Sequence, residues 1–316
     1  MEPVRICIVS KFPPIEGGIA SRTYWQVRRL LEEGHEVTVV TNAGATEREY
    51  RIQGCEEHLR RLTKRYPLEL HDVSGEAPWH IPCGPDHLER LLSVLLSVLD
   101  RKRFDVLESG YLVPYGIAAG LASKLTGIPH VVRHGGSDVA KLLPHPQYHE
   151  LLTRILRQAE KVITDEQSEP LLRSAGARTE LAPAYEPDSK VFAPRPVPRS
   201  ATMPVYAYIG KINYHWQRRG LDKLVGWYRA NATKAALRIV GQGVGRAEFE
   251  RWMSAQELSN PIPVEPFVPP WRVPDLLAEV DGVFCLSVGD PITSDSMLQR
   301  EARAMKRVVL ESLPAS

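Results

Sequence analysis

The sequence predicts an α/β fold made of two Rossmann-like, doubly wound domains. Short apolar runs alternate with helix-like segments from one end of the 316-residue chain to the other. Apolar strands separated by helices form a parallel sheet covered on both faces, and right-handed crossovers wind such a sheet in two directions. The proline-rich stretch EPDSKVFAPRPVPRSATMP interrupts this alternation once. We therefore expect an N-terminal domain over 1–185, a linker over 186–204 and a C-terminal domain over 205–316.

The N-terminal half carries seven apolar runs of strand length with helical patterns between them. We expect strands at Val4–Val9, Glu36–Thr41, Leu68–His71, Asp105–Glu108, His130–Arg133, Lys161–Thr164 and Thr179–Ala182. We expect helices at Ile19–Glu33, Leu88–Asp100, Pro114–Leu125, Tyr148–Ala159 and Ser168–Ser174. The loops that follow the strands then lie together at one edge of the sheet, where ligands bind.

The C-terminal half repeats the pattern after the linker. We expect strands at Val205–Ile209, Ala236–Val240, Pro263–Pro266, Gly282–Leu286 and Val308–Leu310. We expect helices at Leu221–Arg229, Arg246–Gln256, Pro274–Ala278 and Ser296–Met305. A ligand is expected where the carboxyl ends of both sheets face one cleft.

Composition excludes several classes of protein. With 43% hydrophobic and 25% charged residues the chain matches globular proteins rather than disordered or fibrous ones. A net charge of +2 gives no reason to expect a nucleic-acid partner. The N-terminus lacks the layout of a signal peptide, and the apolar run Leu91–Leu99 is about half the length that spans a bilayer. These features predict a soluble, cytoplasmic protein.

The cysteines and histidines give no metal-binding pattern. The four cysteines, Cys7, Cys55, Cys83 and Cys285, show no paired spacing. The first and last fall inside expected strands as small core residues, whereas a disulfide between the middle two stays open. His145 and His149 are four residues apart, but a proline lies between them, so no metal site is expected.

The stretch KFPPIEGGIASR, residues 11–22, follows the first strand and opens the first long helix. Free backbone amides at a helix start attract anions such as phosphate, and Gly17 and Gly18 leave the main chain open to a ligand. The pattern is not the G-x-G-x-x-G dinucleotide motif. A plain structural turn is the alternative interpretation.

A second glycine pair lies in VVRHGGSDV, residues 131–139, directly after an expected strand. His134 and Asp138 at the end of a parallel strand are placed to face a ligand. The alternative is structural: the imidazole would be satisfied by neighbouring backbone, and the carboxylate would cap a turn.

Two loops of the C-terminal half combine glycine with basic residues. In YIGKINYHWQRRGLDKL, Gly210 and Lys211 follow a strand, and Arg218 and Arg219 precede a helix. These cations could neutralise a departing diphosphate, although a solvated basic loop has the same appearance. The next strand runs into a glycine turn, LRIVGQG, that contains Gly241 and Gly243.

Basic residues also gather in HLRRLTKRY, residues 58–66, and at 101–103. A patch of this kind could contact a membrane surface or an anionic acceptor. A solvated face is the alternative.

The loops, taken in order, resemble those of the GT-B glycosyltransferases and, within them, the large retaining family 4. The matching segments are VSKFPPIEGGIASRTYWQVRRLLEEGHEVTVVT, VVRHGGSDV, VITDEQSEPLLRSAGA, YIGK with RRG, IVGQG, and REARAMKRVVL. The resemblance covers nearly the whole chain. It implies two Rossmann-like domains that face a cleft.

The resemblance also implies an activity. A nucleotide-diphospho-sugar would be held mainly by the C-terminal domain, and a glycan or lipid-linked acceptor mainly by the N-terminal one. Transfer would retain the anomeric configuration and would need neither a metal nor a cofactor. Relatives of this kind often build surface polysaccharides or glycolipids, so peripheral contact with the inner face of the membrane is expected.

Residue roles follow from the resemblance by position. His134, Lys211 and Arg219 would be catalytic, with Arg218 competing for the last role. Glu301 would accept hydrogen bonds from the ribose hydroxyls, and Asp138 would lie on the acceptor side. The remaining donor-binding positions would be Gly17, Gly18, Gly210, Gly241, Gly243, Asp295 and Ser296.

The chain departs from the pattern of the family at four places. One is the spacing of Lys211 and Arg219, which are eight residues apart, a wider gap than is usual. Thr293 stands where a first glutamate is usual, and Asp290 or Asp295 would have to substitute for it. Tyr185 ends a Pro-Ala-Tyr where Pro-Asn-Gly is usual. The sequence stops at Ser316 without the usual closing helices, so we expect a shortened domain and, there, a partner chain or a second copy. A non-catalytic nucleotide-sugar-binding or scaffold protein is therefore the alternative function.

Overall fold

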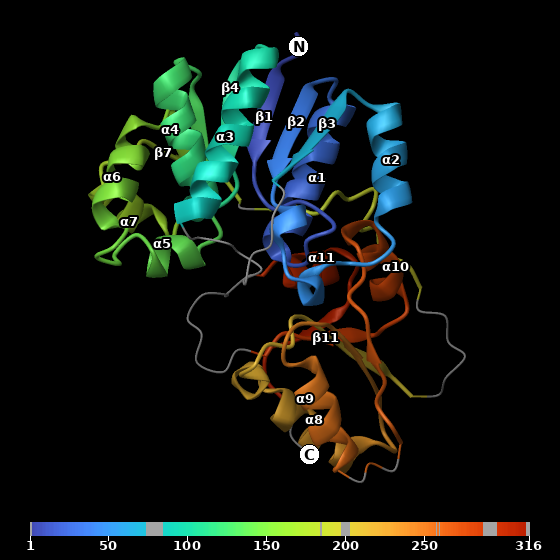
Figure 1. The fold of residues 1–316 in the computed structure, drawn as a ribbon. Helices are drawn as coiled ribbons and strands as arrows, with labels where there is room; N and C mark the ends of the chain where they lie inside the picture. The colour runs from blue at the N-terminus through green and yellow to red at the C-terminus, as the bar shows by residue number, and fades with distance from the viewer. Residues whose placement is uncertain are drawn as a thin grey trace. The chain divides into compact units, whose positions relative to one another are not determined.

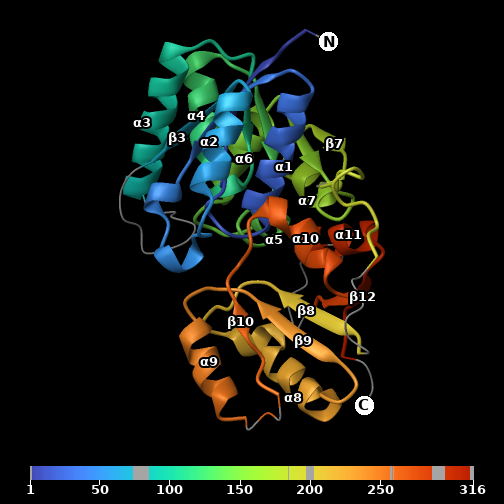
Figure 2. The same cartoon turned by 90° about the vertical axis from the view of Figure 1, so that its right-hand side faces the viewer.

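The computed structural model describes residues 2–73, 85–183, 185–196, 203–256, 258, 260–286 and 296–313. The chain divides into two compact units, Met1–Tyr185 and Glu186–Ser316. Each unit is built around one parallel sheet (Figures 1 and 2). The predicted α/β class with two doubly wound sheets is confirmed.

The first unit holds a seven-stranded sheet in the order β3-β2-β1-β4-β5-β6-β7, and every neighbouring pair is parallel. The strands are β1 (Arg5–Val9), β2 (Glu36–Thr41), β3 (Leu68–Asp72), β4 (Val106–Ser109), β5 (His130–Arg133), β6 (Lys161–Thr164) and β7 (Thr179–Leu181). All seven occur within one residue of the predicted bounds. The chain order reverses between β1 and β4, which makes the end of those strands the switch point of the sheet.

In the described part of this unit, seven helices flank the sheet. They are α1 (Gly18–Glu32), α2 (Glu56–Arg65), α3 (Pro85–Arg101), α4 (Ile117–Thr126), α5 (Ser137–Lys141), α6 (His149–Gln158) and α7 (Glu169–Ser174). Right-handed crossovers place α1 and α3 on opposite faces, as Figure 2 shows. Buried leucines of α3 and alanines of α4 form one core cluster with Cys7, Val9 and Leu107 of the sheet.

Several helices of this unit differ from the prediction. Helix α3 begins at Pro85 rather than Leu88, and α5 was not predicted. Helix α4 begins at Ile117 rather than Pro114, because a π-helical segment over Leu112–Gly116, interrupted at Val113, precedes it. Helix α2 was not predicted as a helix, since its sequence reads as a run of charged residues in which Leu62 is the one buried side chain.

The second unit holds a five-stranded parallel sheet in the order β10-β9-β8-β11-β12. The strands are β8 (Val205–Ile209), β9 (Ala236–Val240), β10 (Val264–Glu265), β11 (Gly282–Phe284) and β12 (Val308–Leu310), and the helices are α8 (Leu221–Asn231), α9 (Arg246–Ser254), α10 (Val273–Ala278) and α11 (Met297–Ala304). Its core contains an aromatic cluster in which Trp216 packs 5.0 Å from Phe249 and 4.8 Å from Trp252 between ring centroids.

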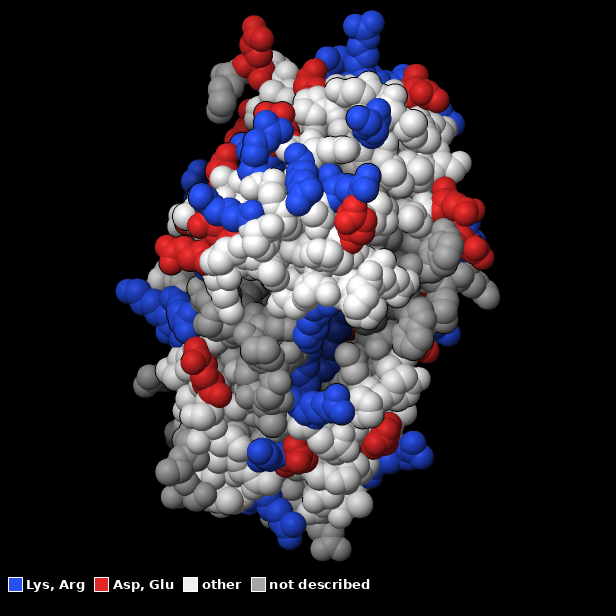
Figure 3. Space-filling model, turned by 90° about the vertical axis from the view of Figure 1, so that its left-hand side faces the viewer, with Lys and Arg blue, Asp and Glu red and all other residues white. Residues whose placement is uncertain are grey.

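Many surface charges of the first unit form ion pairs. On the face drawn in Figure 3, blue and red side chains stand side by side, and the pairs on α6 and α7 include Arg154 with Glu150 and Arg173 with Glu169. On α2, Arg60 and Arg61 both contact Glu57. Within the described ranges, no helix combines the length and the apolar character needed to cross a bilayer.

Candidate functional site

The loops at the carboxyl ends of β4 and β5 are tied together by a buried arginine of α1. One guanidinium nitrogen of Arg22 donates to the carbonyl oxygen of His134, and the other donates to that of Gly110 at 2.6 Å. Burial lowers the pKa of Arg22 to about 10, helped by the nearby Arg133, so the group stays charged at neutral pH. Gly110 itself lies so close to Ser10 that a Cβ atom there would stand 2.0 Å from the hydroxyl oxygen.

Arg22 was not among the site residues predicted from the sequence. A signal was present, because this arginine lies four residues after the glycine pair, one helical turn into α1. It therefore shares the face of the helix that Gly18 begins. The partners of its guanidinium are carbonyls 88 and 112 residues away, and sequence spacing does not indicate them.

The glycine pair at the start of α1 leaves the helix end open. Gly17 has φ 110°, a conformation that favours glycine, and a Cβ on Gly18 would meet no atom within 4 Å. No side chain caps the helix and no acidic residue lies in its first turn. The first amides of a helix have no partner inside it, so this end offers donors and a positive dipole to an anion.

His134 is 2% exposed, and both nitrogens of its ring are engaged. Nδ1 accepts a hydrogen bond from the backbone N–H of Gly136 at 3.1 Å, so the ring proton lies on Nε2 and is donated to Thr164 Oγ1 at 2.8 Å. Burial lowers the pKa of His134, which keeps the ring neutral at pH 7. The imidazole is therefore held by its neighbours, as the structural alternative expected, and its donor-sugar role stays a prediction.

Asp138 is fully buried and binds two backbone segments. Its Oδ1 accepts from the N–H of Gly135 and its Oδ2 from the N–H of Leu112, both at 2.8 Å. The carboxylate thus fixes the loop after β5 against the turn that precedes α4. Its predicted place on the acceptor side is not decided by these contacts.

In the second unit, the glycines after β8 and β9 let two loops touch. A Cβ on Gly241 would stand 2.2 Å from the carbonyl oxygen of Gly210, and one on Gly243, where φ is 137°, would stand 2.7 Å from that of Ile212. These contacts are made to backbone, which cannot move aside cheaply. Packing of the loops alone is therefore a sufficient reason for glycine at 241 and 243.

The basic residues after β8 sit on a short 3-10 helix over Trp216–Arg219. Trp216 is 1% exposed and anchors this turn in the aromatic cluster, whereas Arg218 and Arg219 are exposed. Lys211 is half-buried, and its carbonyl oxygen accepts from the hydroxyl of Tyr208 at 3.2 Å. The loop therefore carries three cations beyond the carboxyl end of β8.

Helix α11 carries the last predicted donor residues. Ser296 caps the helix: its hydroxyl accepts from the N–H of Gln299, and the Gln299 amide oxygen accepts from the N–H of Ser296 at 2.5 Å. Glu301 is 4% exposed and is the fifth residue of the same helix. Asp295, together with Asp290 and Thr293, lies outside the described residues.

The described cysteines are free thiols, and the described side chains form no cluster of metal ligands. Cys7 and Cys55 are buried free thiols, and Cys83 lies outside the described residues, as does any pairing that it makes. Among the side chains that the structure describes, no group of three or more His, Cys, Asp or Glu is arranged to hold a metal ion. Metal-independent transfer stays a prediction.

Comparison with known protein families finds a match for most of the first unit. The family model described as "Glycosyl transferase 4-like domain" matches residues 17–184. No curated protein matches the chain closely enough to count as a relative.

Solved structures of glycosyltransferases share the fold of the whole chain. Sucrose-phosphate synthase from Thermosynechococcus elongatus is 16% identical with a TM-score of 0.66, over 97% of this chain and 80% of that one. HepE from Anabaena in complex with UDP and glucose is 13% identical with a TM-score of 0.68, over 98% and 80%. The catalytic domain of starch synthase IV from Arabidopsis thaliana, bound to ADP and acarbose, is 11% identical with a TM-score of 0.60, over 98% and 82%. These neighbours establish the GT-B fold.

Two glycine substitutions in the second unit should change the free energy of unfolding in opposite directions, one in a packed loop and one in a helix. Gly241→Ala should lower the free energy of unfolding by about 1–3 kcal/mol, because its methyl group would overlap the carbonyl oxygen of Gly210. Gly226→Ala in α8 meets no atom within 4 Å and should raise it by about 0.5–1 kcal/mol, because alanine favours the helix. Urea unfolding followed by circular dichroism measures both. Equal stabilities for the two variants would contradict the packing explanation.

The two carbonyl contacts of Arg22 predict that lysine cannot replace it. A single ammonium cannot reproduce the forked pair of donors, so Arg22→Lys should destabilise the protein by about 1–3 kcal/mol in urea unfolding. Arg29→Lys is the matched control, because Arg29 lies on the same helix with 62% of its side chain exposed. If both variants unfold at the same urea concentration, Arg22 does not hold the loops together.

Proposed function

The chain belongs to the glycosyltransferase 4-like family, and from this we propose that it is a retaining glycosyltransferase. It moves a sugar from a nucleotide-diphospho-sugar to a glycan or lipid-linked acceptor, without a metal ion. The observation that carries the proposal is the uncapped start of α1 beside the neutral His134 loop, at the switch point of the first sheet.

The first unit supports this reaction by presenting fixed dipoles. The amides of the first turn of α1 are available to the donor diphosphate, and the open space at Gly18 lets a phosphate approach the main chain. Because Arg22 and Asp138 already bind the neighbouring loops, the donors need little rearrangement when charge develops on the leaving group.

The second unit supports it through cations. Lys211, with Arg218 and Arg219 on the exposed 3-10 helix, supplies positive charge for the departing diphosphate. A set of basic side chains can take the place of a metal ion in this task, which is why we propose metal-independent transfer. Glu301 is proposed to bind the ribose.

The experiment is a donor panel. UDP-, ADP- and GDP-sugars are incubated with the protein, with and without glycan acceptors, and release of the nucleoside diphosphate is followed. UDP and ADP head the panel because HepE is in complex with UDP, and starch synthase IV with ADP. Release from at least one donor is expected. If every nucleotide binds without release, the chain is the non-catalytic alternative.

The diphosphate role of Lys211 gives a matched mutational prediction. Lys211→Ala should weaken the affinity for the nucleoside diphosphate by about 1.5–3 kcal/mol, because it removes a charge-assisted hydrogen bond. Lys223→Ala, on the exposed face of α8, is the control and should bind as the wild type does. Isothermal titration measures both constants, and an unchanged affinity for Lys211→Ala would remove this lysine from the site.

A further inference from the structure

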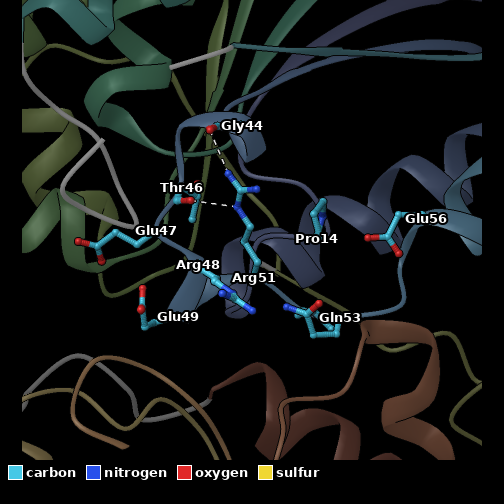
Figure 4. A pocket seen from close by; sticks show the side chains of 10 residues that line it. Pro14, Gly44, Thr46, Glu47, Arg48, Glu49, Arg51, Gln53 and Glu56 are labelled. Carbon is cyan, nitrogen blue, oxygen red and sulfur yellow. Dashed lines mark hydrogen bonds between the residues drawn. The ribbon is translucent and has the colours of Figure 1, made fainter. Parts of the chain in front are cut away.

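The first unit contains a polar cavity that no residue of the proposed donor site lines. It has a volume of about 630 Å³ (Figure 4), within the range of pockets that hold small ligands. It lies beside the segment that follows β2, where 3-10 helices cover Ala43–Ala45 and Arg48–Tyr50. Its lining residues are Pro14, Gly44, Thr46, Glu47, Arg48, Glu49, Arg51, Ile52, Gln53 and Glu56.

The wall of the cavity is joined to the loop that leads into α1. The N–H of Ile52 donates to the carbonyl oxygen of Pro14 at 2.7 Å, and the N–H of Glu16 donates to that of Tyr50 at 2.9 Å. These bonds form an antiparallel bridge between Ile15 and Arg51. Since Gly17 directly follows Glu16, the cavity and the open end of α1 belong to one hydrogen-bonded ribbon.

The inner surface is held in shape by Arg51. Its Nε donates to the carbonyl oxygen of Thr46 and its Nη2 to that of Gly44, both at 2.9 Å, as the dashed lines in Figure 4 show. The guanidinium therefore closes the turn between the two 3-10 helices and fixes the backbone from which Glu47, Arg48 and Glu49 extend.

The lining suits a ligand that both donates and accepts hydrogen bonds. The carboxylates of Glu47, Glu49 and Glu56 accept, Arg48 donates, and Gln53 does both. Sugar hydroxyls have this dual character. The two apolar side chains of the lining are those of Pro14 and Ile52, and Ile52 is 2% exposed. Most of the lining side chains are polar, which suits a sugar better than an acyl chain.

The charge of the lining disfavours an anion. Three glutamates face two arginines, which leaves one net negative charge, and Arg51 already binds two carbonyl oxygens. Burial and the nearby Glu49 raise the pKa of Glu47, as expected where carboxylates crowd one another. A phosphate placed here would meet like charges.

We propose that this cavity is the acceptor subsite and that it takes an uncharged sugar, rather than a sugar phosphate or a lipid chain. The inference rests on the proposed transfer function, because the cavity lies on the ribbon that ends at Gly17. For a lipid-linked acceptor, the cavity would hold the sugar part alone.

Ligand-observed NMR on the full chain tests the proposal with matched probes. The neutral probes are the methyl glycosides of glucose, galactose and mannose, and the charged probes are the corresponding 6-phosphates. A neutral sugar should bind more tightly than its phosphate by about tenfold or more. The double variant Glu47→Gln with Glu49→Gln should narrow that ratio, because it removes two negative charges and keeps the side-chain shape. Glu33→Gln, at the far end of α1 from Gly17, should leave the ratio unchanged.

Two results would overturn the inference. One is a phosphorylated sugar that binds as tightly as its neutral parent, and the other is a ratio that the double variant leaves unaltered. The donor panel keeps this failure apart from that of the proposed function. If a donor is hydrolysed and none of the neutral sugars binds, the acceptor assignment alone is wrong. If no donor is hydrolysed, the transfer function is wrong.

Discussion

The loops at the carboxyl edge of the first sheet depend on the hydrogen bonds of one buried cation, the guanidinium of Arg22. Transfer of a guanidinium out of water costs several kcal/mol unless its N–H groups find partners. For Arg22 those partners are carbonyl oxygens at the ends of β4 and β5. Asp138 does the complementary task, because its carboxylate binds amides of the same two loops. A cation that binds carbonyls and an anion that binds amides thus fix three segments far apart in the sequence.

This arrangement explains why the imidazole of His134 is neutral and held on both ring nitrogens. The carbonyl oxygen of His134 accepts a hydrogen bond from Arg22, and its Nδ1 accepts one from the N–H of Gly136. Its Nε2 donates to the hydroxyl of Thr164. The ring proton is already donated to Thr164, and burial lowers the pKa of the imidazole. Such a ring is poorly suited to proton transfer. We therefore expect the loop to act through fixed dipoles, while cations of the second unit meet the charge of the leaving diphosphate.

Most strands were predictable from sequence because they are short, mainly apolar segments bounded by helical patterns or turn residues. Helix α2 was not, since its surface is charged and Leu62 is its one buried residue. Of the predicted site residues, Gly17 was recognisable from its place after β1. The contacts of Arg22 could not be predicted, because they join residues about 90 and 110 positions apart without any periodic pattern. The cavity could not be predicted from the sequence for the same reason. Its wall is a segment without a periodic pattern, and the hydrogen bonds of Arg51 to two carbonyl oxygens fix its shape.

The central claim is the proposal that the preformed edge of the first unit binds the nucleotide-sugar donor. Hydrogen exchange measured by mass spectrometry, with and without a nucleotide-sugar that the protein hydrolyses, tests it most directly. We expect slower exchange at residues 17–22 and 134–139 and, in the second unit, at 210–220. Slower exchange confined to the second unit, with unchanged rates at residues 17–22 and 134–139, would contradict the claim.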